Sequence, residues 1–163
     1  MVERPGWDDY FLGIAQAVAA RAECTRAQHG CVLVDADHRI LSTGYNGTPP
    51  GDRRSCESGD CPRGTDRALP GHAEGQHDYA NCIALHAEQN AVANSRGVRG
   101  STAYITGEPC DMCAKLLAAA GVVRTVVVRF ECDKCGSLMQ PPGGRRRSWC
   151  WSCAPMPLTR IRS

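Results

Sequence analysis

The chain has 163 residues and a formal net charge of +2, and 42% of its residues are apolar and 22% charged. It is long enough for one domain with a small appendage and apolar enough to bury a real core. No apolar run approaches the roughly 18 to 20 residues that a membrane-spanning helix needs, and residues 1–5 lack the basic region and apolar core of a secretory signal. We therefore expect a cytoplasmic protein that does not enter a membrane.

The first predicted elements are a helix and a β-hairpin. Apolar residues recur at helical spacing over residues 8–23, which predicts a helix with Asp8 as its N-cap. The apolar segments 30–35 and 40–45 flank a short run of turn-forming residues. This pattern predicts two antiparallel strands joined by a turn.

Two loops follow the hairpin. Glycine and proline are dense in residues 45–51, which predicts a tight loop without regular structure. Residues 52–81 form a long polar segment that contains cysteines and histidines. Loops of this length are unusual in a compact domain unless they are functional or held by a metal.

Helices and strands then alternate. Residues 86–95 predict a helix, residues 101–106 a strand, and residues 110–120 a helix that ends at Gly121. The valine-rich segment 122–130 predicts a buried strand. The complete order of helix, strand, strand, helix, strand, helix, strand predicts a three-layer α/β domain.

The pattern with the clearest chemical meaning is H-A-E followed by P-C-x-x-C. It contains His86, Cys110 and Cys113, one nitrogen and two thiolate ligands, and a catalytic zinc takes about three protein ligands and leaves about one position for water. A helix that begins at Cys110 would aim both thiolates the same way and lower their pKa. Glu88 is close enough in sequence to reach that water without being a ligand, which favours a catalytic site over a structural zinc knuckle.

This signature resembles that of the zinc-dependent cytidine and deoxycytidylate deaminase superfamily, and the resemblance covers roughly residues 8–130. It implies a three-layer cytidine-deaminase-like fold with a mixed central sheet. It also implies hydrolysis at C4 of a cytosine ring. Zinc makes the attacking water a nucleophile at neutral pH, because it lowers the pKa of water from 15.7 toward about 7. On this resemblance Glu88 is the catalytic residue, which carries a proton from that water to ring N3 and later to the departing ammonia.

Several segments resemble the deoxycytidylate branch more than the free-nucleoside branch. The loop G-Y-N-G-T-P-x-G implies that Asn46 helps to hold the substrate, with an asparagine in a left-handed turn as the alternative. By the same analogy, the backbone amide of Ala87 holds the pyrimidine carbonyl oxygen. Arg26 is a candidate phosphate contact because a guanidinium meets phosphate oxygens through two donors, with a surface arginine of no such role as the alternative.

The expected reaction is therefore the conversion of dCMP to dUMP and ammonia. Another cytosine nucleotide, a related biosynthetic substrate or a single-stranded nucleic acid are the alternatives. Relatives of this branch are commonly homohexamers, which implies a homo-oligomer. Glu88 argues against a non-catalytic zinc module, which has no use for a carboxylate beside an open zinc position.

Eleven cysteines are many for this length, and in a reducing compartment they indicate metal binding. Cys24 resembles a cysteine that some deoxycytidylate deaminases use for a second, structural zinc. The candidate companions are Cys56, His77 and Cys82, with Cys61 and His72 as rivals. The alternative is that these cysteines are simply buried or free.

The tail departs from the family pattern. It carries two C-x-x-C pairs separated by 14 residues, which are Cys132 and Cys135, then Cys150 and Cys153. This spacing is typical of a zinc ribbon in which all four ligands are cysteines, with a redox pair as the alternative. We therefore predict a catalytic domain over residues 1–130 and a zinc ribbon over residues 131–163, with one catalytic zinc and at least one structural zinc.

Basic charge is concentrated in the same tail. Residues 129–163 carry seven basic side chains against two acidic ones, so the rest of the chain is net acidic. The run Arg145-Arg146-Arg147 lies close to Trp149 and Trp151, and such residues can grip a phosphate backbone and stack on bases. We favour a solvated hairpin tip on which the tryptophans pack, so nucleic acid is the less expected partner.

Overall fold

The computed structural model describes residues 4–66, 82–131 and 138–139. The elements are α1 (Trp7–Ala19), β1 (Gly30–Val34), β2 (Ile40–Tyr45), α2 (Pro62–Thr65), α3 (Ala87–Ala93), β3 (Thr102–Ile105), α4 (Asp111–Ala120), β4 (Arg124–Val127), β5 (Phe130–Glu131) and β6 (Leu138–Met139). The predicted order is confirmed as far as β4, and the short helix α2 is an addition within a segment that we expected to be loop.

A mixed four-stranded sheet forms the centre of the fold, with strand order β2-β1-β3-β4. β1 runs antiparallel to both β2 and β3, whereas β3 and β4 are parallel and are joined through α4. The β1–β2 connection is the predicted hairpin turn, in which Oδ1 of Asp35 accepts the backbone N–H groups of Asp37 and Arg39. The mixed sheet agrees with the expected fold class.

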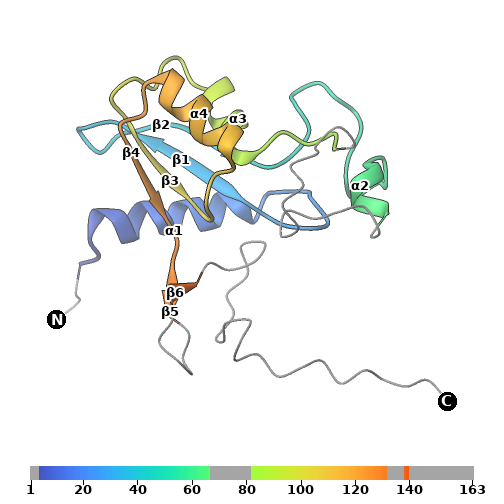
Figure 1. Ribbon diagram of the computed structural model, residues 1–163, viewed down its shortest axis with the longest axis horizontal. Coiled ribbons are helices and arrows are strands. Elements are labelled where there is room, and N and C mark those ends of the chain that lie inside the picture. Colours follow the sequence, from blue (N-terminus) through green and yellow to red (C-terminus); the bar gives the residue numbers. More distant parts are fainter. Residues whose placement is uncertain (1–3, 67–81, 132–137, 140–163) are drawn as a thin grey trace.

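Helices cover both faces of this sheet, with α1 on one side and α3 and α4 on the other (Figure 1). The residues of β1 alternate between the two layers, as the two-residue period of a strand requires. Val32 and Val34 pack in the core with α1, whereas Cys31 and Leu33 pack in the core with α3 and α4. The three-layer α/β prediction is confirmed.

Two glycines allow the helices to lie close against the sheet. A Cβ atom on Gly30 would overlap the Ala15 carbonyl oxygen of α1, and one on Gly44 would overlap backbone atoms of Ala87 and Ala91 in α3. Any side chain at Gly44 would therefore displace the helix whose first turn follows His86. The position of α3 depends on this close approach.

The start of α1 differs from the prediction. Gly6, and not Asp8, is the N-cap, and the helix ends at Ala19 rather than near residue 23. The carboxylate of Asp8 instead accepts two hydrogen bonds from the Arg124 guanidinium, at 2.9 and 2.6 Å, and one from the Tyr104 hydroxyl at 3.0 Å. A charge-assisted bidentate pair is a stronger partner than a backbone amide, so Asp8 ties α1 to β4.

The strand predicted as buried is only half-buried. Arg124 and Thr125 are exposed, and Val126 and Val127 are intermediate, because β4 lies at one edge of the described sheet. Beyond it, β5 and β6 pair antiparallel, with Phe130 opposite Met139. This short hairpin flanks residues 132–137 in the sequence, and the rest of the predicted ribbon domain lies outside the described residues.

None of the helices in the described ranges is both long enough and apolar enough to cross a membrane.

Candidate active site

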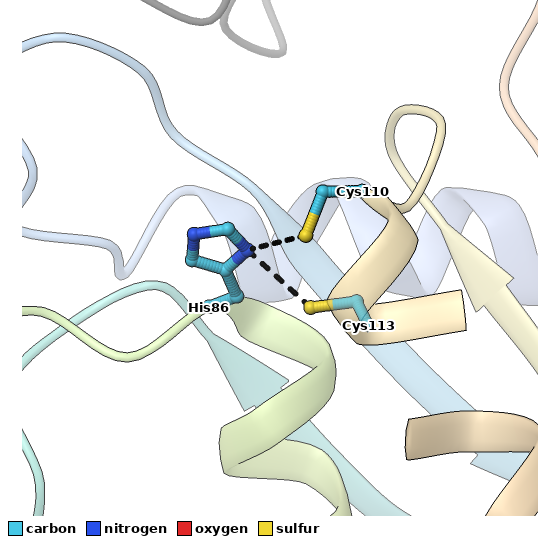
Figure 2. Close-up of side chains that lie close together, drawn as sticks. All are labelled: His86, Cys110 and Cys113. Carbon is cyan, nitrogen blue, oxygen red and sulfur yellow. Dashed lines mark hydrogen bonds between the residues drawn. The ribbon is translucent and has the colours of Figure 1, made fainter. Parts of the chain in front are cut away.

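The three predicted zinc ligands meet at the N-termini of two helices. Nδ1 of His86 lies 3.3 Å from Sγ of Cys113 and 3.5 Å from Sγ of Cys110 (Figure 2). His86 is the N-cap of α3 and Cys110 is the N-cap of α4. The ligand atoms of all three residues lie within 4.8 Å of one another, so residues far apart in sequence form one cluster.

The spacing of this cluster fits a zinc ion. Zinc–ligand distances of about 2.3 Å to sulfur and about 2.05 Å to nitrogen, at tetrahedral angles, separate a sulfur from a nitrogen ligand by about 3.6 Å. The observed separations of 3.3 and 3.5 Å are close to that value. One imidazole and two thiols are also a donor set that suits zinc.

The surroundings of Cys113 in the protein disfavour the thiolate form of its side chain. Burial raises the pKa of the Cys113 thiol well above its ordinary value, and the charges of Glu88 and Cys110 add to the shift. The lowered thiol pKa that we predicted from the helix N-terminus is therefore outweighed at this residue. A divalent cation supplies the charge that stabilises thiolates at such a position.

Glu88 lies in the first turn of α3, beside this cluster. It is 5% exposed, and burial raises its pKa above the ordinary value of 4.5, whereas hydrogen bonds with its own backbone and with Cys113 oppose the rise. The negative charge of Glu88 also raises the pKa of Cys31 in β1, although burial is the larger cause of that shift. A buried carboxyl with a raised pKa is suited to accept and return a proton near neutral pH.

Gln89 supports the site in a way that we did not predict from the sequence. Its side-chain Oε1 accepts the backbone N–H of His86 at 2.7 Å. This contact satisfies a backbone donor at the start of α3 and fixes the residue that carries the imidazole. The signal was present in the sequence, because glutamine three residues after an N-cap is one half of a capping box.

Asn46 lies in the loop after β2 and is 8% exposed. Its Oδ1 accepts the backbone N–H of His29 at 2.7 Å, and its Nδ2 donates to the carbonyl of Ala27 at 2.8 Å. Among the described non-glycine residues only His38 has a positive φ, so the alternative of a left-handed turn at Asn46 is wrong. The side chain fastens this loop to residues 27–29, and a carboxamide retains capacity for further hydrogen bonds.

The other two expected substrate contacts have different surroundings. Nη2 of Arg26 donates to the Asp66 carbonyl at 2.7 Å, which joins it to the end of α2. Ala87 is completely buried at the start of α3, where its backbone lies against Gly44.

Cys24, Cys56, Cys61 and Cys82 influence one another electrostatically, and we call them the four-cysteine cluster. Their ligand atoms are more widely spaced than those of His86, Cys110 and Cys113, which in the described part of the chain are the one group with all ligand atoms within 4.8 Å of one another. The thiol of Cys61 interacts with those of Cys56 and Cys82, and Cys24 influences both Cys56 and Cys82 electrostatically. Burial, followed by the neighbouring thiols, raises the pKa of Cys56 to about 12. Cys61 thus lies with the three expected cysteines, whereas His72 and His77 lie outside the described residues.

Hydrogen bonding favours the thiolate form at one member of this four-cysteine cluster. Burial opposes ionisation of Cys61, but hydrogen bonds with the backbone of Ile83 and Gly64 and with the thiols of Cys56 and Cys82 lower its pKa overall. Both Cys56 and Cys61 are 2% exposed. The ribbon cysteines Cys132, Cys135, Cys150 and Cys153 lie outside the described residues.

Comparisons with known proteins agree with this arrangement. The family described as "Cytidine and deoxycytidylate deaminase zinc-binding region" matches residues 5–129. A deoxycytidylate deaminase of Mycobacterium phage D29 is 43% identical over 127 residues, which span 77% of this chain and 96% of that protein. The deoxycytidylate deaminase of Schizosaccharomyces pombe is 34% identical over 151 residues, which span 90% of this chain but 45% of that protein.

Solved structures give the same assignment. The apo dCMP deaminase of cyanophage S-TIM5 has a TM-score of 0.57 and 28% identity, and the match covers 77% of this chain and 84% of that one. The same enzyme in complex with dCMP and dUMP matches with a TM-score of 0.57 and 26% identity. The resemblance drawn from the H-A-E and P-C-x-x-C motifs is confirmed, and the chain belongs to the cytidine and deoxycytidylate deaminase family.

Proposed function

We propose that this chain is a zinc-dependent hydrolase that converts dCMP and water to dUMP and ammonia. The observation that carries the proposal is the cluster of His86, Cys110 and Cys113 with the buried carboxyl of Glu88 beside Cys113. The substrate is supported by the phage relative, which is named a deoxycytidylate deaminase and is matched over almost its whole length. The cyanophage structure that holds dCMP and dUMP supports it further.

The chemistry follows from the roles of these four residues. His86, Cys110 and Cys113 would hold a zinc ion, which when bound would lower the pKa of water toward about 7. Glu88 takes a proton from the attacking water and delivers it to N3 of the cytosine ring, which makes C4 more electrophilic. A bond from oxygen to C4 forms, and Glu88 then takes the second proton of that oxygen and passes it to the amino nitrogen. The bond from C4 to this nitrogen breaks, which releases ammonia and leaves a carbonyl group at C4.

The substrate contacts belong to the same proposal. Asn46 holds the sugar and base, and the backbone amide of Ala87 holds the pyrimidine carbonyl oxygen. The Gly47–Leu85 bridge supports this because it brings the loop of Asn46 beside the start of α3. Arg26 is proposed to contact the phosphate, and its hydrogen bond to Asp66 is compatible with that role because a guanidinium carries five donors.

We also propose a structural zinc ion in the four-cysteine cluster. Four thiolates are a ligand set typical of closed structural zinc sites. The set is supported by the interactions of Cys61 with Cys56 and Cys82 and by the electrostatic influence of Cys24 on Cys56 and Cys82. In this set Cys61 takes the place expected for His77. The ion would join the end of α1 to the long loop before α3.

A third zinc ion in the tail remains part of the proposal, together with a domain boundary near residue 130. The antiparallel strands β5 and β6 support it, because they bring together the two ends of the segment that contains Cys132 and Cys135. A homo-oligomer is likewise proposed. It is supported by the resemblance to the deoxycytidylate branch, whose members are commonly homo-oligomers.

The substrate proposal is tested by measuring ammonia release from dCMP, CMP, deoxycytidine, dCTP and a cytosine-containing single strand. We expect turnover of dCMP that far exceeds turnover of the other four. Turnover confined to the single strand, with strong salt dependence of binding, would instead favour the polynucleotide alternative. Absence of turnover on all five compounds would refute a pyrimidine nucleotide as the substrate.

A further inference from the structure

Asn90 makes contacts that the proposed chemistry does not use. It lies on α3, two residues after Glu88, and is 6% exposed. Its Nδ2 donates to the carbonyl oxygens of Tyr45 at 2.8 Å and Gly47 at 3.3 Å. Asparagine is a poor residue for a helix interior, so its value here lies in the contacts that its side chain makes outside the helix.

The contact with Gly47 spans the catalytic motif. The carbonyl oxygen of Gly47 accepts the backbone N–H of Leu85 at 2.9 Å as well as Nδ2 of Asn90. Leu85 precedes His86, and Asn90 follows Glu88. The carbonyl group of Gly47 thus binds one residue before the H-A-E segment and one residue after it.

The remainder of this loop, residues 45–48, is anchored to a different part of the chain. Asn46 is hydrogen-bonded to residues 27–29, and Thr48 donates its backbone N–H and its hydroxyl to Oε1 of Glu23, at 3.3 and 3.2 Å. Asn90 therefore links α3, which carries Glu88, to the loop, which carries the candidate substrate ligand Asn46. The carbonyls that it holds are those of the residues immediately before and after Asn46.

We propose that Asn90 is a positioning residue that fixes Asn46 relative to Glu88 and thereby sets the affinity for the nucleotide. This inference rests on the proposed function, because it takes Asn46 as a substrate ligand. Asn90 acts through Asn46 and does not touch the reacting atoms. His86 is also fixed by Gln89, and α3 by its packing on the sheet, so loss of the Asn90 contacts should loosen the loop more than the metal site.

The substitution Asn90→Asp tests this most sharply. It keeps the size of the side chain but replaces the amide donor with an oxygen that faces two carbonyl oxygens. We expect the KM for dCMP to rise by about tenfold, the size of effect that loss of a buried hydrogen-bond donor produces. The value of kcat should change by less than about threefold and the zinc content should not change. Asn94→Ala, at the exposed C-cap of the same helix, is the matched control and should leave both constants unchanged.

A double-substitution cycle separates positioning from general damage. If Asn90 acts through Asn46, Asn90→Ala combined with Asn46→Ala should lose less kcat/KM than the product of the two single losses. Multiplicative losses would overturn the inference. So would a fall in kcat and zinc content without a rise in KM, since that would place the role of Asn90 in the metal site.

Hydrogen exchange gives a readout that does not depend on turnover. Asn90→Asp should speed amide exchange in residues 45–48 relative to residues 40–44 of β2, and Asn94→Ala should not. If the wild-type chain does not deaminate dCMP, the proposed function fails, but the exchange measurement still decides whether Asn90 fixes the loop. Unchanged exchange in both variants would overturn the inference, whatever the substrate.

Discussion

Nδ1 of His86 lies 3.3 Å from Sγ of Cys113, although 27 residues separate them along the chain. The contact exists because α3 and α4 pack on the same face of the sheet and present their N-termini to one another. The metal site is therefore a consequence of the three-layer fold. Substitutions that move α3 or α4 should therefore weaken zinc binding before they affect other properties of the protein.

The thiol of Cys113 should be essential for the catalytic zinc. Cys113→Ser replaces a thiolate ligand with a much poorer donor, so we expect loss of one zinc ion per chain and of deaminase turnover. Cys31→Ala is the control, because Cys31 is an equally buried thiol near Glu88 that is not a ligand. Metal analysis of the purified variants checks this, and retention of zinc by Cys113→Ser would contradict the ligand assignment.

Substitutions of Cys61 and His77 should show which of them is the fourth ligand of the proposed structural zinc. Cys61→Ser should remove one zinc ion per chain and lower the free energy of unfolding by several kcal/mol, on the order expected for loss of a structural metal. His77→Ala should leave zinc content and stability unchanged. Metal analysis with denaturant unfolding measures both quantities, and the opposite pattern would restore His77 as the ligand.

The ion pair between Asp8 and Arg124 should stabilise the fold in a pH-dependent way. Hydrogen bonding to Arg124 lowers the pKa of Asp8 below its ordinary value of 3.8, despite opposition from burial, and Tyr104 adds to the lowering. A group whose pKa is depressed in the folded state stabilises the protein above its unfolded pKa, and this contribution is lost as the pH falls through the folded pKa. Both side chains are about half exposed, so solvent screening limits the effect to about 1 kcal/mol or less.

Asp8→Asn should therefore be less stable than the wild type at pH 7, and the two should converge as the pH falls below 3.8, the ordinary pKa of the Asp8 carboxyl, and through its lower folded pKa. Asp9→Asn, at an exposed neighbouring position on α1, should show no such difference. Denaturant unfolding at a series of pH values measures this. A stability difference that stays constant with pH would mean that packing, and not charge, makes Asp8 important.

Gly44 should tolerate no side chain. A Cβ atom there would overlap backbone atoms of Ala87 and Ala91, so Gly44→Ala should displace α3, with a cost of about 1–3 kcal/mol in unfolding free energy and a loss of zinc affinity. Gly13→Ala is the control, and it should change the free energy of unfolding in the opposite direction. Nothing lies within 4 Å of a Cβ at that position in α1, so it should stabilise the fold by about 0.5–1 kcal/mol.

The sequence predicted the catalytic cluster because His86, Cys110 and Cys113 belong to short motifs at helix starts, where local geometry determines where ligands point. It did not predict the partner of Asp8, because Arg124 is 116 residues away and a local pattern can offer only a helix cap. The sequence does not decide between Cys61 and His77 as a zinc ligand, because an irregular loop has no period from which proximity can be inferred.

Asn90 was overlooked for a related reason. The groups that it binds are backbone carbonyls 43 and 45 residues earlier, which leave no residue-type signature in the sequence. The strand β4 was predicted as buried because valines are common in strands of both kinds. Its place at the outside of the described sheet depends on topology, which the local sequence does not specify.

The most direct test of the central claim, that Glu88 moves the protons, is the turnover of dCMP by the variant Glu88→Gln, measured together with zinc content. Glutamine has the size of glutamate but cannot take up and release the proton. We predict that zinc remains bound while kcat falls by about 10²- to 10⁴-fold, the range expected for loss of general acid–base catalysis. A variant that keeps its zinc and deaminates dCMP within a few-fold of the wild-type rate would contradict the central role of Glu88.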